Sequence, residues 1–168
     1  MKLKNMLEEC GAVKYGDFTL TSGKKSKYYV DIKMASTRPD ILRVVAKKMA
    51  AFVEGDKIAG MELGAVPIAV ALALETGLRY VMVRKKTRSH GTGSRLEGVL
   101  HEGEKVVVVE DVATTGGSSV ETVELLRGEG AVVEKVLVVV DREEGGTQAL
   151  KEIDVELIPL VRARDLLD

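Results

Sequence analysis

The residue types best suited to chemistry stand in one stretch, VVVVEDVATTGGSS at residues 106–119. Glu110 and Asp111 follow four valines, and a run rich in glycine, serine and threonine follows the two acids. Glycines let successive backbone amides turn toward one anion, and the helix that follows adds the positive end of its dipole. Carboxylates beside such a cradle repel an anion unless a cation or a hydroxylated sugar lies between them. A ribose phosphate satisfies both halves, because carboxylates accept hydrogen bonds from sugar hydroxyls while the amides bind the phosphate.

An ordinary helix cap is the alternative interpretation of the loop, since glycine and serine are also common at helix N-termini. Other nucleotide-binding patterns do not match. The chain has no G-x-x-x-x-G-K-[ST] segment, and GTGSRL at residues 91–96 lacks the third glycine of a dinucleotide fingerprint. The acidic pair therefore favours a sugar-phosphate site over a plain cap.

A second group of reactive side chains lies in the polar segment at residues 84–97. Glycines at positions 91 and 93 follow a cationic set that consists of Arg84, Lys85, Lys86, Arg88 and His90. Charge runs are usually solvated loops. A cationic arm with glycine hinges can also close over a diphosphate leaving group, exclude water and neutralise the developing charge.

These segments need a scaffold that brings strand ends together, and the chain predicts an α/β fold with an open parallel sheet flanked by helices. We expect helices at residues 3–10, 39–52, 66–76 and 117–129, a hairpin with strands at 18–21 and 27–32, and strands at 57–60, 80–83, 105–109 and 132–140, followed by a last strand and a short helix. Alternating strands and helices indicate a parallel sheet covered on both faces, with ligands at the carboxyl ends of the strands. The valine-rich runs predict strands buried on both sides.

Composition limits the class of protein. The 168 residues fit one domain, and 25 lysines and arginines nearly cancel 26 aspartates and glutamates, so no global field favours nucleic acid as a partner. The single cysteine, Cys10, excludes an internal disulfide and a cysteine-based zinc cluster. The apolar run after Pro67 is shorter than the roughly 20 residues that cross a bilayer, and the start does not read as a signal peptide. We expect a cytoplasmic protein without membrane or nucleic-acid partners.

The stretch at residues 106–119 resembles the phosphoribosyl-diphosphate motif of the type I phosphoribosyltransferases. Within that family, the segment at 84–97 is similar to the mobile catalytic loop of orotate phosphoribosyltransferases. FTLTSGKKSKYY at 18–29 resembles their N-terminal hairpin, and VDREEGG at 140–146 resembles their orotate-contacting segment. The resemblance runs from about residue 3 to 146, and implies one phosphoribosyltransferase domain, 1–168, with a helix and β-hairpin hood at 1–35.

The resemblance assigns roles to residues. The implied ligands of phosphoribosyl diphosphate are Arg84, Lys85, Arg88, His90, Glu110, Asp111, Val112, Ala113, Thr114, Thr115, Gly116, Gly117 and Ser118. Glu110 and Asp111 are expected to hold the ribose hydroxyls, and residues 112–118 the 5-phosphate. Orotate is expected to contact Thr114 and Arg142, since a guanidinium recognises a planar carboxylate well. The implied catalytic residues are Lys85, Arg88, His90 and Asp111.

The implied reaction is transfer of ribose 5-phosphate from phosphoribosyl diphosphate to orotate, a step of de novo pyrimidine (UMP) biosynthesis. Mg²⁺ is expected to bind through substrate oxygens and water, with no dedicated protein ligands. A homodimer with shared active sites is also implied. Many bacterial members carry lysine at the positions of Thr21 and Gly64, which shifts the cationic roles to lysines 24, 25, 85 and 86.

Two alternatives remain open at this point. One is a phosphoribosyltransferase for another base, against which the hairpin and Arg142 count. The other is a ligand-sensing regulator with the same fold that binds nucleic acid, which would need an additional basic face or a helix-turn-helix segment.

Overall fold

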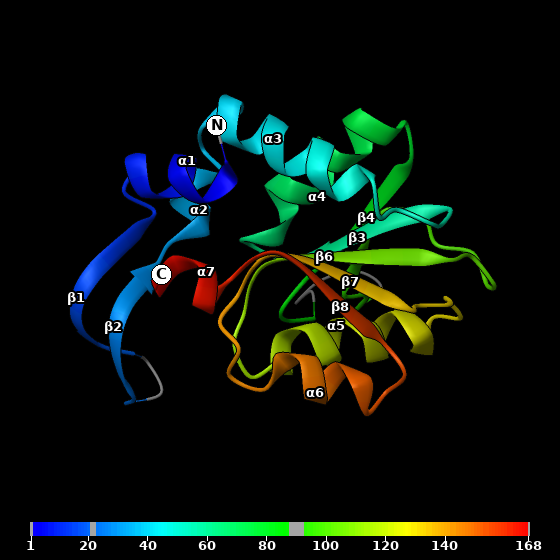
Figure 1. The fold of residues 1–168 in the computed structure, drawn as a ribbon. Helices are drawn as coiled ribbons and strands as arrows, with labels where there is room; N and C mark the ends of the chain where they lie inside the picture. Colours follow the sequence, from blue (N-terminus) through cyan, green and yellow to red (C-terminus); the bar gives the residue numbers. More distant parts are fainter. Residues whose placement is uncertain (1, 21–22, 88–92, 168) are drawn as a thin grey trace.

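The computed structural model describes residues 2–20, 23–87 and 93–167. Within these ranges, the centre is a six-stranded sheet in which β5 alone runs antiparallel to its neighbour (Figure 1). The order across the sheet is β5 (Leu96–Glu97), β4 (Arg79–Val83), β3 (Lys57–Met61), β6 (Val106–Ala113), β7 (Lys135–Asp141) and β8 (Glu156–Arg162). The predicted α/β class with a parallel sheet is confirmed.

The valine run of β6 is buried on both faces of the sheet. Val107 and Val109 belong to the core on the side of α3 and α4, whereas Val106 and Val108 belong to the core on the side of α5 and α6. All four are at most 2% exposed. Successive residues of a strand point to opposite faces, so a strand with helices on both sides needs continuous apolar residues.

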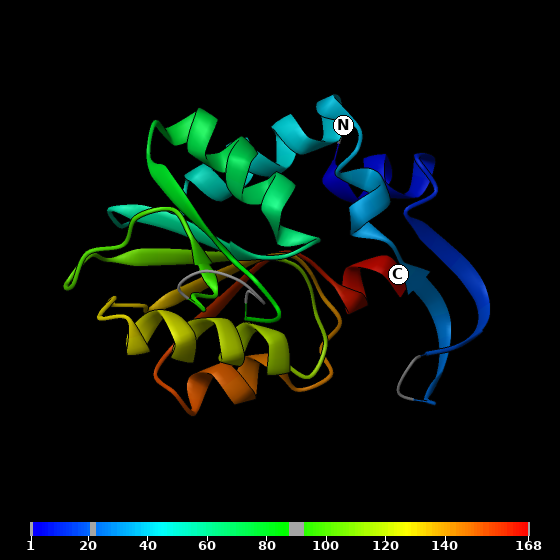
Figure 2. The same cartoon turned by 180° about the vertical axis from the view of Figure 1, so that it is seen from behind.

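Two pairs of helices cover the sheet. Helices α3 (Pro39–Ala50) and α4 (Ala65–Thr76) lie over one face, and α5 (Gly117–Gly128) and α6 (Gly146–Lys151) lie over the other (Figures 1 and 2). Helix α3 buries Ile41, Val45 and Met49, which repeat every four residues on one side of the helix.

The N-terminal region forms a separate layer beside the sheet. It contains α1 (Leu3–Glu9), the antiparallel hairpin of β1 (Val13–Thr19) and β2 (Lys25–Val30), and α2 (Ile32–Ala35). The C-terminal helix α7 (Ala163–Leu167) lies next to this hairpin (Figure 1), and the hydroxyl of Tyr15 donates a hydrogen bond of 2.7 Å to the carbonyl oxygen of Leu166. The hairpin is thereby connected to the end of the chain.

Several bounds differ from the sequence prediction. Strand β6 does not end at residue 109 but continues through the acidic pair to Ala113, because its pairing with β7 continues to Asp141. The first hairpin strand lies at Val13–Thr19 and not at 18–21, since the hairpin projects from the core and its residues are mostly exposed, without an apolar alternation. Helices α2 and α6 and the two-residue β5 were not predicted, because elements this short contain too little periodicity.

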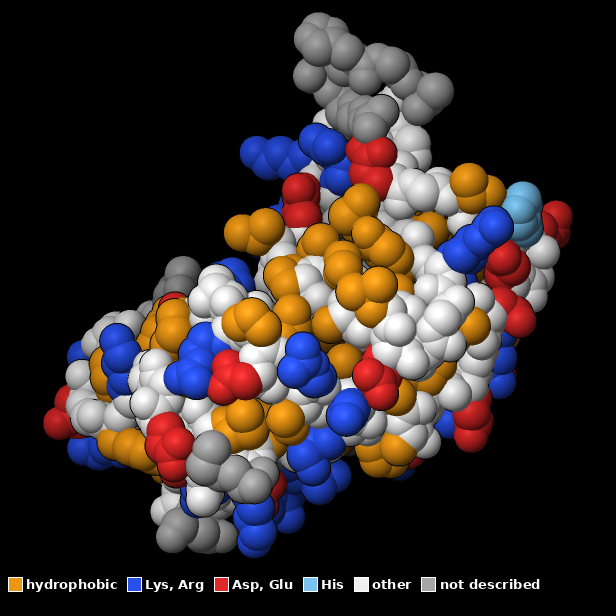
Figure 3. Space-filling model, turned by 90° about the horizontal axis from the view of Figure 1, so that it is seen from above, with side chains coloured by type: hydrophobic (Ala, Val, Ile, Leu, Met, Phe, Trp, Pro, Cys, Tyr) orange, Lys and Arg blue, Asp and Glu red, His pale blue; other side chains and the backbone are white. Residues whose placement is uncertain are grey.

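One face of the molecule gathers hydrophobic side chains (Figure 3). A groove of about 450 Å³, here called the apolar groove, is lined by Val70, Ala73, Leu74, Leu78, Arg79, Tyr80 and Val99. Leu74 is 83% exposed. Among the helices of the described ranges, none is both long and apolar enough to span a membrane.

Candidate active site

The candidate site lies where the strand order reverses. Strand β4 lies on one side of β3 and β6 on the other, so the carboxyl ends of β3 and β6 frame the switch point of the sheet. Ligands of open α/β sheets bind in this crevice. Residues 62–64 follow β3, the acidic pair lies near the end of β6, and Arg142 follows β7. Three segments far apart in the sequence therefore meet at one edge.

A cleft with two connected halves occupies this edge. The hairpin half, about 590 Å³, is lined by Thr19, Leu20, Lys24, Tyr29, Val30, Lys33, Asp111, Val112, Thr114, Thr115, Arg142 and Glu144. The β3 half, about 320 Å³, is lined by Lys33, Met61, Glu62, Leu63, Gly64, Lys85, Glu110, Asp111, Val112 and Ser118. The two halves share Lys33, Asp111 and Val112.

The glycine-rich loop leads directly into α5. Gly116 precedes the helix with a φ of 88°, a backbone conformation that residues other than glycine rarely adopt. A β-carbon at this position would lie 2.9 Å from the Cα atom of Gly146, so the loop also packs tightly against α6. The amide of Gly146 donates to the carbonyl of Thr114 (3.0 Å). This packing holds the loop in place at the positive end of the α5 dipole, an arrangement suited to a phosphate.

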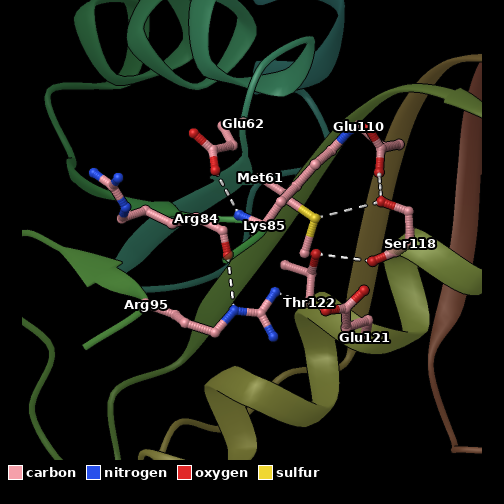
Figure 4. Close-up of polar contacts among 9 residues, drawn as sticks. All are labelled: Met61, Glu62, Arg84, Lys85, Arg95, Glu110, Ser118, Glu121 and Thr122. Carbon is pink, nitrogen blue, oxygen red and sulfur yellow. Dashed lines mark hydrogen bonds and ion pairs between the residues drawn. The ribbon is translucent and has the colours of Figure 1, made fainter. Parts of the chain in front are cut away.

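The two carboxylates have different environments. Glu110 is 6% exposed, and its Oε2 atom accepts a hydrogen bond from the hydroxyl of Ser118 at 3.4 Å (Figure 4). Burial, and next the adjacent Asp111, raise the pKa of Glu110 to about 8. The Oδ1 atom of Asp111 accepts a hydrogen bond from the amide of Val112 (2.9 Å), and its Oδ2 atom lies 3.6 Å from the Nζ atom of Lys33. Asp111 lines both halves of the cleft, whereas Glu110 lines only the β3 half.

Arg142 is a buried cation at the wall of the hairpin half. Its Nε atom donates to Oε1 of Glu144 at 2.9 Å, and one terminal nitrogen donates to the hydroxyl of Ser26 at 3.1 Å. The guanidinium lies over the ring of Tyr28, 4.6 Å from the ring centroid. Three contacts from two segments thus orient a group that can bind a planar carboxylate.

The beginning of the basic segment joins the β3 half. The amide of Lys85 donates to Oε1 of Glu62 at 2.6 Å, and the Lys85 side chain extends toward the side of the cleft where Glu110 lies (Figure 4). Arg84 pairs instead with Glu97 (3.3 Å) and lines neither half. Arg95 links the far end of the segment to α5 through Glu121 (2.6 Å).

Most of the predicted site residues lie together at this cleft. The structure places Lys85, Glu110, Asp111, Val112, Thr114, Thr115, Ser118 and Arg142 on its walls. Ala113 is buried behind the loop, and its carbonyl accepts a hydrogen bond from the amide of Arg142 (2.9 Å). Gly116 and Gly117 form the turn into α5. Arg88 and His90, like Thr21, lie outside the described residues, and the ligand contacts predicted for all these positions stay predictions.

Among the polar residues of the cleft and its support that sequence reasoning missed are Lys33, Glu62, Ser26 and Glu144. Lys33 belongs to the unpredicted helix α2, and only the fold brings it opposite Asp111. The structure also explains why residue 64 is a glycine. A β-carbon there would collide with the carboxylate of Asp111, which occupies the space beside the loop after β3.

Comparison with known proteins gives consistent matches. The family model of the phosphoribosyl transferase domain matches residues 33–158. Orotate phosphoribosyltransferase of Methanosarcina acetivorans is 52% identical over 164 residues, which cover 96% of this chain and 88% of that protein. The crystal structure of orotate phosphoribosyltransferase from Aeropyrum pernix is similar with a TM-score of 0.88 and 34% identity, over 98% of this chain and 96% of that one. The Mycobacterium tuberculosis enzyme in complex with 5-phospho-α-D-ribosyl 1-diphosphate is similar with a TM-score of 0.80 and 27% identity, over 99% of each chain.

Proposed function

The chain belongs to the orotate phosphoribosyltransferase family, and we propose that it transfers ribose 5-phosphate from phosphoribosyl diphosphate to orotate. The products are orotidine 5′-phosphate and diphosphate, which places the reaction in pyrimidine biosynthesis. One observation supports this function above the others. A phosphate-binding turn, an acidic pair and a buried, oriented arginine line one cleft at the switch point of the sheet.

The reaction breaks the bond between C1 of the ribose and a diphosphate oxygen, and forms a bond between that carbon and N1 of orotate. No covalent nucleophile is needed. The loop after β6 and the start of α5 hold the 5-phosphate, and the carboxylates of Glu110 and Asp111 accept hydrogen bonds from the ribose hydroxyls. Asp111 lines both halves of the cleft, so a ribose bound across them develops its positive charge next to this carboxylate, which stabilises it.

Orotate binds in the hairpin half. Its carboxylate pairs with Arg142, whose guanidinium is already oriented by Glu144, Ser26 and the ring of Tyr28. Thr114 lines the same half and adds a hydrogen bond to the pyrimidine. This arrangement places the base against the hairpin and leaves the β3 half for the diphosphate.

The charges of the β3 half support a divalent cation. Its lining contains two carboxylates, from Glu62 and Asp111, two lysines, Lys33 and Lys85, and Glu110, which keeps its proton near neutral pH because its pKa is raised to about 8. The negative charges of a diphosphate there stay largely uncompensated unless a cation enters with it. We propose that Mg²⁺ binds mainly through diphosphate and ribose oxygens and water, and that it neutralises the leaving group. No group of three or more His, Cys, Asp and Glu side chains in the described ranges is arranged to hold a metal ion.

We also propose a homodimer in the cytoplasm, with the basic segment of one subunit reaching the site of the other. The exposed apolar groove supports a second copy as partner, since its lining would be shielded from water by self-association. Because Lys85 lines the cleft of its own subunit, Arg88 is the better choice for this test. Mixing Arg88→Ala subunits with Asp111→Asn subunits should restore part of the activity through hybrid dimers. An absence of recovery after verified subunit exchange would contradict shared sites.

The direct test is spectrophotometric. Orotate should be consumed in the presence of phosphoribosyl diphosphate and Mg²⁺, and Arg142→Ala should reduce this rate by about two orders of magnitude or more, since the loss of a charge-assisted pair removes several kcal/mol. Replacing orotate by uracil, adenine or hypoxanthine tests the alternative bases. Failure of the wild-type chain to consume orotate over a range of pH and temperature would refute the proposal, and salt-sensitive DNA binding without turnover would favour the regulator.

A further inference from the structure

Lys33 occupies a position in the cleft that the reaction described above does not use. It lies on α2, the short helix between the hairpin and α3, and Asp31 caps this helix by accepting a hydrogen bond from the amide of Met34 (3.1 Å). Ile32 and Ala35 face the core and are at most 2% exposed. Because neighbouring residues of a helix point in different directions, burial of these two leaves Lys33 facing the cleft.

Lys33 is one of the residues that line both halves of the cleft. Its Nζ atom lies 3.6 Å from Oδ2 of Asp111, and its side chain remains 60% exposed. The Asp111 side chain is only 14% exposed, but the ammonium group is solvated and 3.6 Å is longer than a hydrogen bond, so the ammonium group can turn to a stronger anion that enters the cleft. Asp111 then becomes available for the ribose hydroxyls.

On the basis of the proposed function, we infer that Lys33 is a further substrate-binding residue, whose ammonium group binds the diphosphate of phosphoribosyl diphosphate at the end next to the ribose. The boundary between the two halves is where the bond to the diphosphate breaks, since the base occupies one half and the leaving group the other. A cation at this boundary acts on the phosphate that gains charge first.

The charge balance of the β3 half gives the same result. Lys33 and Lys85 are the two lysines that line this half, opposite the carboxylates of Glu62 and Asp111. Without Lys33, the diphosphate would meet those carboxylates with a single lysine from the described lining. The alternative role is structural: Lys33 orients Asp111 and never contacts the substrate. The two roles differ in the ligands whose affinity they change.

Equilibrium binding without orotate separates them. Isothermal titration calorimetry with Mg²⁺ should compare phosphoribosyl diphosphate with ribose 5-phosphate, for the wild type, Lys33→Ala, Lys33→Met and Lys33→Arg. Loss of the ammonium group should raise the Kd for phosphoribosyl diphosphate roughly tenfold while changing that for ribose 5-phosphate less than about twofold. Lys33→Arg should recover part of the affinity. Lys47→Ala is the matched control, because Lys47 is exposed on α3 and lines neither half.

Two results would overturn the inference. Equal weakening of both ligands would show that Lys33 acts only through Asp111, and unchanged binding of both would show that it does neither. Thermal unfolding of each variant shows whether the variant is still folded. Lys33→Met keeps much of the aliphatic side chain, so it removes the charge with less loss of packing than Lys33→Ala. The binding measurement contains no orotate. It can therefore be interpreted even if the wild type fails to consume orotate in the turnover assay.

Discussion

Protonation of Glu110 should make the stability of this chain depend on pH near neutrality. The side chain is 6% exposed, next to a second carboxylate, and burial followed by the interaction with Asp111 raises its pKa from the ordinary 4.5 to about 8. In the unfolded chain, Glu110 has lost both causes and titrates at its ordinary value. Between about pH 4.5 and 8, the folded state therefore binds more protons than the unfolded state.

The sign and size of the effect follow from this difference. Stability from the protonated Glu110 is fully present below about pH 4.5 and is lost as the pH rises through about 8. The free energy of unfolding changes by at most about 1.4 kcal/mol for each pH unit, which gives an upper bound on the order of 5 kcal/mol over the whole window. Glu110→Gln keeps the shape and removes the titration.

Urea titrations of wild type and Glu110→Gln at pH 5, 6, 7, 8 and 9 measure the effect as a difference. Groups that titrate equally in both proteins cancel, so the difference isolates Glu110. The wild type should lose stability relative to Glu110→Gln as the pH rises to 8 and then level off. Asp111→Asn removes the second cause and should reduce the dependence. A difference between wild type and Glu110→Gln that stays constant with pH would refute the buried, proton-retaining state of Glu110.

Two further predictions concern residues that hold the site and the sheet in place. Gly116→Ala should lower the free energy of unfolding by about 2 kcal/mol or more in urea titrations, because Gly116 has a positive φ and packs against Gly146. The same change should raise the KM for phosphoribosyl diphosphate. Gly128→Ala, at the other end of α5 with open space around it, is the control and should not lower stability. Lys57→Met should lower the free energy of unfolding by about 2 kcal/mol, because buried Lys57 donates to Oε2 of Glu104 (2.7 Å). The KM values should not change, since Lys57 lies at the start of β3, at the end of the sheet opposite the cleft. Adding Glu104→Gln should recover part of the lost stability, and full stability of Lys57→Met would contradict this role.

Much of the fold could be predicted because its signals are local. The valine runs predict the buried strands β6 and β7, and the four-residue repeat predicts the helix α3 with one buried side. Each of these patterns is complete within a few residues. The hairpin bounds and the short helices could not be predicted in the same way, since those residues are mostly exposed or too few to show a period.

The order of residues along the chain is enough to identify the family and to predict most of the site residues that the structure brings to the walls of the cleft. Glu110, Asp111 and the glycine-rich loop are neighbours in the chain, so their chemistry is visible without a fold. How these groups pair with distant residues depends on the tertiary structure. Lys33 meets Asp111 across 78 positions, and Ser26 of the hairpin holds Arg142 across 116 positions. Such contacts depend on strand order and on packing of the hairpin against the sheet, and neither is encoded in the spacing of nearby residues.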